Sequence, residues 1–177
     1  MHWAVDFTVS DINVVPATQD DLEPLAHMHG RAIDFPDLMR RQNAGLGVLL
    51  IARVKGLPVG TVYARWEPPD EPYLQRMLPG TPLLYRLLVH PYCRRRGVAT
   101  KLLAEAEARI RRRGRGAVAL GVALKNFDAI DLYTKRGYAA WRRYPIRTTT
   151  TALLADGTTG TVPDRCWIFI KRLRSGS

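Results

Sequence analysis

The sequence predicts one α/β (α+β) domain in which helices lie on the faces of a mixed β-sheet. The chain has 177 residues, a length that suits a single domain spanning residues 1–177. Its residues are 46% hydrophobic and 24% charged, which excludes collagen-like and disordered chains. Apolar runs of strand length also alternate with stretches of helical periodicity, as mixed folds require.

The N-terminal half predicts a strand, two helices and a hairpin. Thr18 and Asp21 have the spacing of a capping box, which favours a helix start. Two β-rich runs that flank a short Gly-containing turn are typical of a hairpin. The expected elements are a strand at 11–16, a helix from 18 to about 32, a helix from 36 to about 42, and strands 48–54 and 58–66 around the three-residue turn Lys55-Gly56-Leu57.

The C-terminal half predicts a central strand followed by alternating helices and strands. Five prolines within residues 67–82 favour a long loop without regular structure. The Thr-rich segment 148–163, with a turn signal at Asp156-Gly157, is a candidate for a homodimer contact or for a flap over a cleft. The remaining expected elements are strand 83–89, helix 99–113, strand 117–123, helix 126–136 ended by a left-handed Gly137, and strands 138–144 and 166–173.

Membrane, secreted and metal-bound classes find no support in the sequence. The longest apolar stretch, residues 47–52, is far shorter than the roughly 20 residues of a membrane helix. The N-terminus lacks the basic start and apolar core of a secretory leader, so we expect a cytoplasmic protein with no membrane partner. Cys93 and Cys166 are far apart and lack CxxC spacing, so we expect neither a disulfide framework nor a metal site.

The basic side chains gather in the second half of the chain. The whole sequence carries 27 Lys and Arg against 16 Asp and Glu; residues 1–93 hold 8 basic and 10 acidic side chains, and residues 94–177 hold 19 and 6. This asymmetry predicts an anionic ligand for the second half, either nucleic acid or a phosphorylated cofactor. A compositional bias toward Arg, with solvated side chains, is the third interpretation.

The clearest functional pattern lies in residues 89–99, VHPYCRRRGVA. A buried strand is stopped by Pro91, an Arg-rich turn follows, and Gly97 stands at the mouth of a helix. The first N–H groups of a helix have no partner within it and its dipole is positive there, so that end attracts phosphate. Gly97 allows close approach of the backbone, and Arg adds bidentate contacts. The segment therefore predicts a diphosphate-binding turn, the alternative being a structural turn with solvated arginines.

This segment resembles the acyl-CoA signature of the GCN5-related N-acetyltransferase (GNAT) superfamily, which is Arg or Gln, two residues, Gly, any residue, and Gly or Ala. Arg94, Gly97 and Ala99 match it. A second block, residues 126–138, is similar to the helix and strand that follow in the family. The resemblance covers about residues 83–140 as the CoA-binding core. It implies a GNAT-like mixed, mostly antiparallel sheet of six to seven strands with helices on both faces.

The resemblance also implies acetyl-CoA as acyl donor and assigns residues to it. The backbone of Leu87, Leu88 and Val89 would bind the pantetheine arm and the acyl carbonyl, and Asn126 would contact the pantetheine end. Tyr133 would lie near the sulfur, where a phenol of pKa about 10 can protonate a departing thiolate of pKa about 8.5. The residues expected to hold the pyrophosphate are Arg94, Arg95, Arg96, Gly97, Val98, Ala99 and Thr100.

An amine acceptor must lose a proton, because an alkylammonium has a pKa of about 10.4. Members of the superfamily often carry a carboxylate for this purpose either on the strand before Asn126 or on the central strand. The matching positions of this chain are Gly121 on the first strand and Tyr85-Arg86 on the second, so neither carboxylate is present. Glu67, Asp70 and Glu71 on the Pro-rich segment are the remaining candidates. Glu67 is preferred because it follows a strand end, where side chains are held rigidly. A water chain or an amine of low pKa is the alternative.

We therefore expect an N-acyltransferase in which an amine attacks acetyl-CoA directly within a ternary complex, while a strand N–H near Leu88 polarises the carbonyl. The acidic balance of residues 1–93 favours a small cationic amine or a lysine side chain as acceptor. One alternative is an acyl-CoA-binding sensor with little catalytic activity. The other is a basic nucleic-acid-binding protein, which is less favoured because no stacking-aromatic motif accompanies the arginines.

Overall fold

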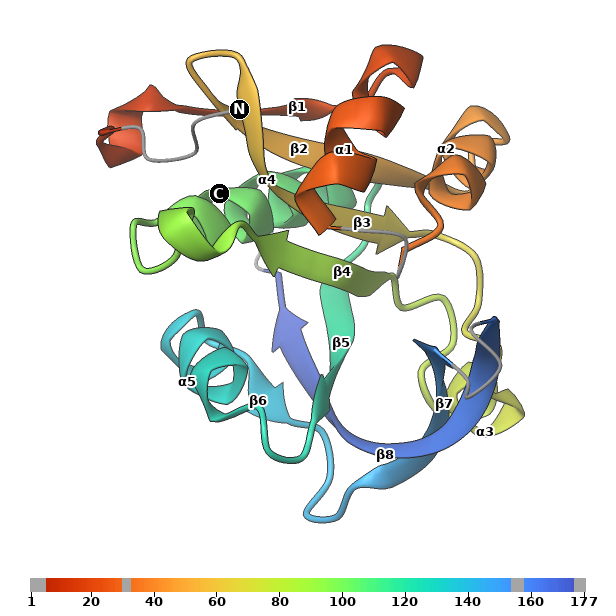
Figure 1. Ribbon diagram of the computed structural model, residues 1–177. Helices are drawn as coiled ribbons and strands as arrows, with labels where there is room; N and C mark the ends of the chain where they lie inside the picture. The colour runs from red at the N-terminus through yellow and green to blue at the C-terminus, as the bar shows by residue number, and fades with distance from the viewer. Residues whose placement is uncertain (1–5, 30–32, 154–157, 174–177) are drawn as a thin grey trace.

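The computed structural model describes residues 6–29, 33–153 and 158–173, which form a β-sheet with helices on both of its faces (Figure 1). The fold class is the predicted one. The strands are β1 (Ile12–Pro16), β2 (Gly47–Val54), β3 (Leu57–Arg65), β4 (Leu83–Val89), β5 (Ala117–Ala123), β6 (Ala139–Ala140), β7 (Ile146–Leu153) and β8 (Thr159–Arg172). The helices are α1 (Leu22–His29), α2 (Phe35–Asn43), α3 (Pro72–Met77), α4 (Val98–Arg112) and α5 (Phe127–Lys135).

The sheet has the order β1-β2-β3-β4-β5-β8-β6, with β7 paired to β8. Its neighbours are antiparallel except for β4 and β5, which are parallel. This pair is joined only at Leu83↔Ala119 and Leu84↔Leu120. Beyond these residues the two strands diverge and open the sheet at its middle (Figure 1). The described strands number eight, because the Thr-rich segment contributes β7 and the start of β8.

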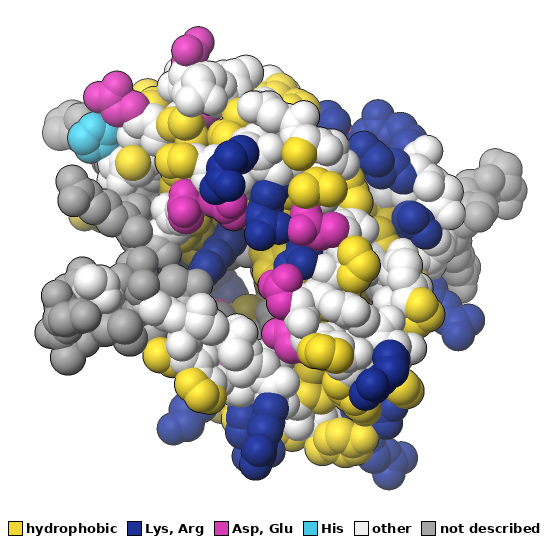
Figure 2. Space-filling view, turned by 90° about the vertical axis from the view of Figure 1, so that its right-hand side faces the viewer, with side chains coloured by type: hydrophobic (Ala, Val, Ile, Leu, Met, Phe, Trp, Pro, Cys, Tyr) yellow, Lys and Arg dark blue, Asp and Glu magenta, His cyan; other side chains and the backbone are white. Residues whose placement is uncertain are grey.

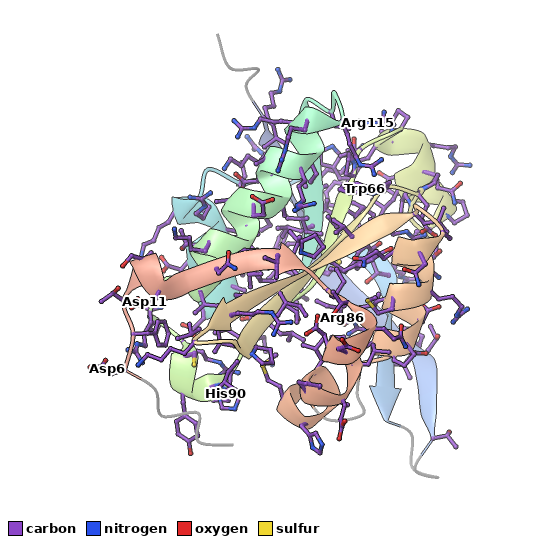
Figure 3. The ribbon with its side chains drawn as sticks, turned by 90° about the horizontal axis from the view of Figure 1, so that it is seen from above. Asp6, Asp11, Trp66, Arg86, His90 and Arg115 are labelled. Carbon is purple, nitrogen blue, oxygen red and sulfur yellow. The ribbon has the colours of Figure 1, made fainter. Side chains whose placement is uncertain are left out.

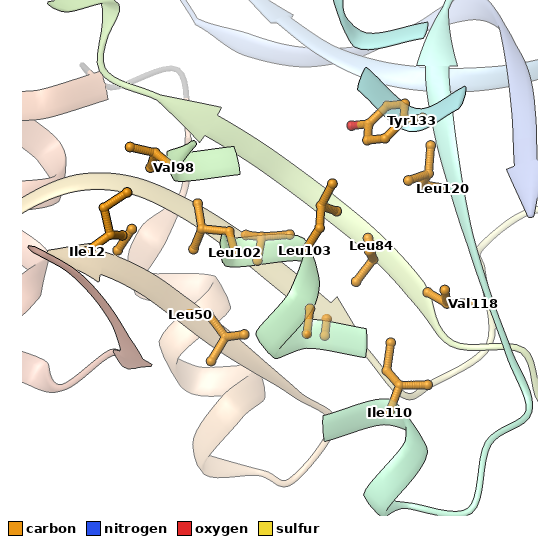
Figure 4. Close-up of a cluster of buried hydrophobic side chains, with 14 of the residues drawn as sticks. Ile12, Leu50, Leu84, Val98, Leu102, Leu103, Ile110, Val118, Leu120 and Tyr133 are labelled. Carbon is orange, nitrogen blue, oxygen red and sulfur yellow. The ribbon is translucent and has the colours of Figure 1, made fainter. Parts of the chain in front are cut away.

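Helix α4 covers one face of the sheet and α1 and α2 cover the other. Leu102, Leu103 and Ile110 of α4 are fully buried in the cluster that contains Leu50 and Leu84 (Figure 4). Each such side chain contributes roughly 1.5–3 kcal/mol through its burial. On the opposite face, the buried side chains of α1 and α2 pack against alternate positions of β2 and against β3. The helix residues are Leu25, Met28, Phe35 and Met39, and the strand residues are Leu49, Ile51 and Tyr63. Both faces of the sheet are thus covered, which explains the nearly continuous apolar run of β2.

The buried carboxylate of Glu107 ties α4 to the C-terminal elements. It accepts hydrogen bonds from Lys171 Nζ at 2.7 Å and Tyr138 Oη at 3.0 Å, and Arg136 Nη2 lies 3.3 Å away. Because Arg136 and Tyr138 directly follow α5, this cluster fixes the helix that carries Tyr133 against the sheet.

The prediction of an irregular loop over residues 67–82 is wrong in its middle, where α3 forms. Pro72 occupies the first turn of the helix, where its missing N–H is not needed. Glu71 is the N-cap residue, and Leu74 and Leu78 are buried beneath the helix. The prolines therefore start this helix rather than prevent it.

Two further boundaries differ from the prediction. The β2–β3 turn has two residues, because Leu57 already pairs with Val54; Lys55 and Gly56 both have positive φ, 49° and 82°, as a type I′ turn requires. The strand predicted at 138–144 is only β6, and β8 begins at Thr159, before residue 166. The predicted turn at Asp156-Gly157 lies outside the described residues. Within the described part of the chain, no helix has both the length and the apolar character needed to cross a membrane.

Candidate active site

The divergence of β4 and β5 places two cavities side by side. The first, which we call the turn cavity, has a volume of about 600 Å³ and lies between the end of β4, the turn before α4, and α5. The second, the hairpin cavity, has a volume of about 510 Å³ and lies between β4, β5, the start of α3 and the β7–β8 hairpin. They share five lining residues, Leu87, Leu88, Asn126, Ala129 and Tyr133. A molecule in one cavity can therefore meet a molecule in the other at β4.

Main-chain groups line this meeting point. The β4–β5 ladder stops at Leu84, so the edge of Leu87–Val89 that faces β5 has no strand partner. Buried N–H and C=O groups without a partner are rare in proteins, and an exposed strand edge at the wall of a cavity offers them to a ligand. An extended chain with amide groups can pair with such an edge as an additional strand would.

The turn before α4 is held in an unusual backbone conformation. A 3-10 turn at Pro91–Cys93 follows β4 and buries the Cys93 side chain in the core. Arg95 and Gly97 then have φ of 58° and 84°, in the left-handed region. This conformation favours glycine, and a non-glycine residue adopts it at a cost of about 1–2 kcal/mol. Strained residues of this kind cluster where a backbone must grip a ligand.

The start of α4 presents amide donors to the turn cavity. The first amide bonded within the helix is that of Lys101, which donates to Gly97 O at 3.0 Å. The amides of Val98, Ala99 and Thr100, all of which line the turn cavity, precede it. Arg94 and Arg95 also line the cavity, and Arg94 Nε donates to Val89 O at 3.2 Å. This wall combines a helix N-terminus with two guanidinium groups and suits a phosphorylated ligand.

The structure brings the residues predicted to bind the cofactor to the turn cavity, with the exception of Arg96. The Arg96 guanidinium instead donates to Phe7 O at 2.8 Å and to Asp6 Oδ1 at 3.0 Å, and lies 3.8 Å from the centre of the Phe7 ring. The side chain of Val9 packs against Gly97. Residues 6–11, which we call the N-terminal strap, thus pack on the outer side of the turn before α4. Figure 3 shows Asp6 and Asp11 together at one edge of the molecule.

Tyr133 stands at the boundary of the two cavities. It lines both of them, is 7% exposed, and packs against Tyr138 and Phe169. Burial raises the pKa of Tyr133 to about 12. The phenol therefore keeps its proton at neutral pH and can donate it to an anion formed beside it. Asn126 lies nearby as the N-cap of α5, where its Oδ1 accepts from Ala129 N at 3.2 Å and leaves the amide nitrogen available.

Glu67, the residue predicted as general base, lines neither cavity. Its Oε1 lies 2.5 Å from Arg41 Nη1 and 3.7 Å from Arg65 Nη2, and its side chain is only 20% exposed. Asp70 is occupied in a similar way, since Arg65 donates to both of its carboxylate oxygens. The hydrogen bonds from Arg65 lower the pKa of Asp70. Because Glu67 lies outside both cavities and its carboxylate is held in ion pairs, the structure does not support it in this role.

Glu71 and Asp164 are the other carboxylates of the hairpin cavity. Glu71 is half-buried at the N-cap of α3, its side chain does not cap that helix, and it forms no ion pair with a described residue. Burial raises the pKa of Tyr85 to about 12, and the nearby charge of Glu71 adds to this rise. Glu71 therefore faces the cavity near Tyr85. Figure 2 shows acidic side chains gathered around a hollow whose wall also carries basic groups.

Sequence reasoning left the Thr-rich segment 148–163 open between a dimer contact and a flap over a cleft, and did not predict which cavity it would line. Thr148 and Thr149 of β7 and Thr161 and Asp164 of β8 line the hairpin cavity, so the β7–β8 hairpin forms one of its walls. The pairing Thr148↔Asp164 is visible only in the folded sheet, because the turn signal at Asp156-Gly157 does not by itself fix which residues pair. Gly121 also lines the cavity, where an added Cβ would lie 3.3 Å from Cys166 Sγ. Cys93 and Cys166 are free thiols, and the described residues contain no cluster that could hold a metal.

The sequence profile of the Acetyltransferase (GNAT) family matches residues 15–138. The chain belongs to the GNAT family. Solved structures of other members show the same fold at low sequence identity. The ribosomal-protein-S18-alanine N-acetyltransferase from Escherichia coli is 17% identical with a TM-score of 0.64, over 94% of this chain and 96% of that chain. No curated protein sequence matches this GNAT protein.

Two further structures contain the cofactor of their own protein. The PaiA N-acetyltransferase from Thermoplasma acidophilum, in complex with coenzyme A, is 15% identical with a TM-score of 0.61, over 91% of this chain and 98% of that chain. A GNAT family acetyltransferase from Elizabethkingia anophelis with acetyl-CoA bound is 14% identical with a TM-score of 0.59, over 92% and 99%. At these identities the comparison establishes that the GNAT fold is shared.

Proposed function

We propose that this GNAT protein transfers the acetyl group of acetyl-CoA to the primary amine of a small cationic molecule or a lysine side chain, by direct attack in a ternary complex. The observation that carries the proposal is the meeting of the turn cavity and the hairpin cavity at Leu87, Leu88 and Tyr133. A thioester in the first cavity would face an amine in the second. Family membership, and the coenzyme A or acetyl-CoA bound by the Thermoplasma and Elizabethkingia proteins, support acetyl-CoA as donor.

The turn cavity provides matching groups for each part of the donor. The amides of residues 97–100 and the side chains of Arg94 and Arg95 would bind the diphosphate. The unpaired edge of Leu87–Val89 would hydrogen-bond the amides of the pantetheine arm. Asn126 would contact the end of that arm beside the thioester.

The reaction requires an oxyanion site, a proton donor for sulfur and a proton acceptor for nitrogen. The neutral amine attacks the thioester carbon, and a β4 N–H near Leu88 stabilises the oxygen of the tetrahedral intermediate. The C–S bond then breaks, and the proton of the Tyr133 hydroxyl passes to the thiolate. The nitrogen of the intermediate loses a proton to the proton acceptor, and the phenolate regains a proton from solvent. Counted from the ammonium form of the substrate, the net products are an amide, a free thiol and one proton.

Glu71 is our candidate for the proton acceptor, through water. It lines the hairpin cavity without a described cationic partner, whereas Glu67 and Asp70 are occupied by Arg41 and Arg65. An ammonium group bound near Glu71 would give up its proton along a water chain before attack. The charges of Glu71 and Asp164 also favour a cationic acceptor.

The test measures release of the CoA thiol with acetyl-CoA and a panel of amines, and identifies the acetylated product by mass spectrometry. We expect turnover with cationic amines. We expect Tyr133→Phe to lower kcat about a hundredfold with little change in either KM, because the proton donor is lost. Tyr144→Phe, at an exposed tyrosine outside both cavities, is the matched control.

Binding of coenzyme A without turnover on any amine would instead identify an acyl-CoA-binding sensor. Absence of calorimetric heat with coenzyme A, together with salt-dependent affinity for nucleic acid, would instead identify a basic nucleic-acid-binding protein. Either result would overturn the proposed function.

A further inference from the structure

An arginine faces the hairpin cavity from the strand at which the two cavities meet. Arg86 is the β4 residue just before Leu87, lines the hairpin cavity, and is exposed. It forms no ion pair or side-chain hydrogen bond with a described residue, whereas Arg65 and Arg41 are both occupied by carboxylates. A guanidinium in this position would weaken the binding of a purely cationic acceptor, since like charges repel.

A β-bulge places Arg86 there. Thr61 pairs with Leu88 and Tyr63 pairs with Tyr85, so two residues of β4 stand opposite one residue of β3. Arg86 has a φ of 53°, in the left-handed region that arginine rarely adopts. Regular alternation after Tyr85 would turn residue 86 toward the α4 face, where Leu84 is buried. The bulge instead puts the side chain on the face that carries α1 (Figure 3).

The other charged groups around the hairpin cavity are acidic. Asp70 is paired with Arg65, which leaves Glu71 at the start of α3 and Asp164 on β8 as acids without a described ion-pair partner. Among the described residues, the cavity thus offers one guanidinium without an ion pair, on β4, and carboxylates on the walls contributed by α3 and β8. An acceptor that complements this arrangement has an anionic group close to its reacting nitrogen and a polar or cationic group farther away.

We propose that the acceptor of this GNAT protein is a free α-amino acid with a polar or cationic side chain, whose carboxylate is bound by Arg86. The inference rests on the proposed function and narrows it to one substrate class. The α-amino group attacks the thioester, and the side chain of the amino acid points toward Asp164 and the threonines of the hairpin.

Geometry favours a carboxylate beside the reacting amine. Arg86 is adjacent in the chain to Leu87, at the wall shared with the turn cavity, and successive Cα atoms are about 3.8 Å apart. A group held by Arg86 therefore lies within one side-chain length of the reacting carbon. In an α-amino acid only one carbon separates the amine from the carboxylate, and a guanidinium binds a carboxylate through two parallel hydrogen bonds.

The experiment compares acceptors that differ only in the anionic group. Lysine, ornithine and arginine are each assayed against the matching α-carboxamide and against the decarboxylated amine. We expect kcat/KM to be roughly ten- to a hundredfold higher for the free acid. A preference for the acid over the amide is informative because amidation lowers the pKa of the amine and so increases the fraction of free base.

Variants at Arg86 test whether this residue causes the preference for acceptors that carry a carboxylate. We expect Arg86→Gln to remove most of the selectivity for the carboxylate while acetylation of the decarboxylated amines and the affinity for coenzyme A persist. Arg86→Asn serves as a second variant, because asparagine tolerates the left-handed backbone and keeps the bulge. Arg143→Gln, at an exposed arginine outside both cavities, should leave the selectivity unchanged.

The outcomes separate this inference from the proposed function. Equal or better turnover of amines that lack the carboxylate would overturn the inference and leave the transferase in place. Unchanged selectivity in both Arg86 variants would do the same. Failure of the wild-type protein to acetylate any amine would remove the proposed function and the inference together.

Discussion

The turn cavity and the hairpin cavity differ in how the chain builds them. One wall of the turn cavity is formed by the continuous stretch from β4 into α4, where the polar groups are main-chain amides and arginines, and α5 forms the other wall. The hairpin cavity draws on α3, β4, β5, α5, β7 and β8, and its polar groups are side chains. Main-chain donors suit a ligand that never changes, whereas side chains from several elements can vary independently. In the proposed function, donor recognition therefore depends mainly on residues near one another in the chain, and acceptor recognition depends on residues that meet only in the folded sheet.

The sharpest test of the hairpin cavity compares Glu71, which lines it, with Glu67, which does not. We expect Glu71→Gln to lower kcat/KM for the amine roughly a hundredfold near neutral pH, because the proton acceptor is lost. Glu67→Gln should change kcat/KM less than about threefold and act mainly on thermal stability, because it removes the ion pair with Arg41. Steady-state kinetics and thermal melts of both variants make the measurement. Equal kinetic losses in the two variants would contradict the assignment of Glu71.

In the turn cavity, we expect coenzyme A binding to be sensitive to the backbone conformation at Gly97. Alanine at Gly97 would adopt a φ of 84°, and its Cβ would lie 2.9 Å from Val9 Cγ2. We expect Gly97→Ala to weaken coenzyme A binding about tenfold, the effect of about 1.4 kcal/mol, with no change in the KM for the amine. Calorimetry with coenzyme A measures this effect.

Gly114→Ala is the matched control for Gly97. Gly114 also has positive φ, 74°, but an added Cβ there meets nothing within 4 Å, and the residue lies outside the two cavities. It should lower the melting temperature without weakening coenzyme A binding. The double variant Val9→Ala/Gly97→Ala should recover only the part of the loss that comes from the steric contact. Full recovery would show that φ at Gly97 is unimportant.

A substitution that releases the N-terminal strap should have a smaller effect on acetyl-CoA binding in the turn cavity. Arg96→Gln removes the hydrogen bond to Phe7 O and the stacking on the Phe7 ring. We expect the KM for acetyl-CoA to rise about fivefold while kcat at saturation stays constant, because the turn is less well ordered before binding. Arg111→Gln, at an exposed arginine of α4, is the control. A change in kcat with no change in KM would refute the positioning role of the strap.

The smallest expected effect concerns the boundary of the two cavities at high pH. Burial raises the pKa of Tyr133 and that of Tyr85 to about 12 in the folded protein, from the usual 10. Their contribution to stability is complete below pH 10 and is lost as the pH rises toward 12, because the unfolded chain ionises first. Melting temperatures between pH 9 and 12 should fall above pH 10, and less steeply in Tyr133→Phe. An identical slope in the variant would indicate that Tyr133 is not protected from ionisation.

Much of the fold follows from local pattern. The periodicity of α4, the strand character of β2 to β5 and the left-handed Gly137 are confirmed, because each depends on residues near one another in the chain. The errors arise where a local rule has two readings. Prolines break a helix inside it but start one at Pro72. The Thr-rich segment has a turn signal but no clear strand pattern, and it forms β7 and the start of β8 because these two strands pair with each other.

By itself, the sequence determined the turn that forms one wall of the turn cavity, since the strand stop, the left-handed glycine and the helix start lie close together in the chain. Only the tertiary structure decided the hairpin cavity. In the folded protein Arg96 binds the N-terminal strap and Glu67 pairs with Arg41. Glu71 and Arg86 instead face the hairpin cavity. The physical reason is that a charged side chain acts according to its spatial neighbours, and residues from distant parts of the chain become neighbours only when the sheet has formed.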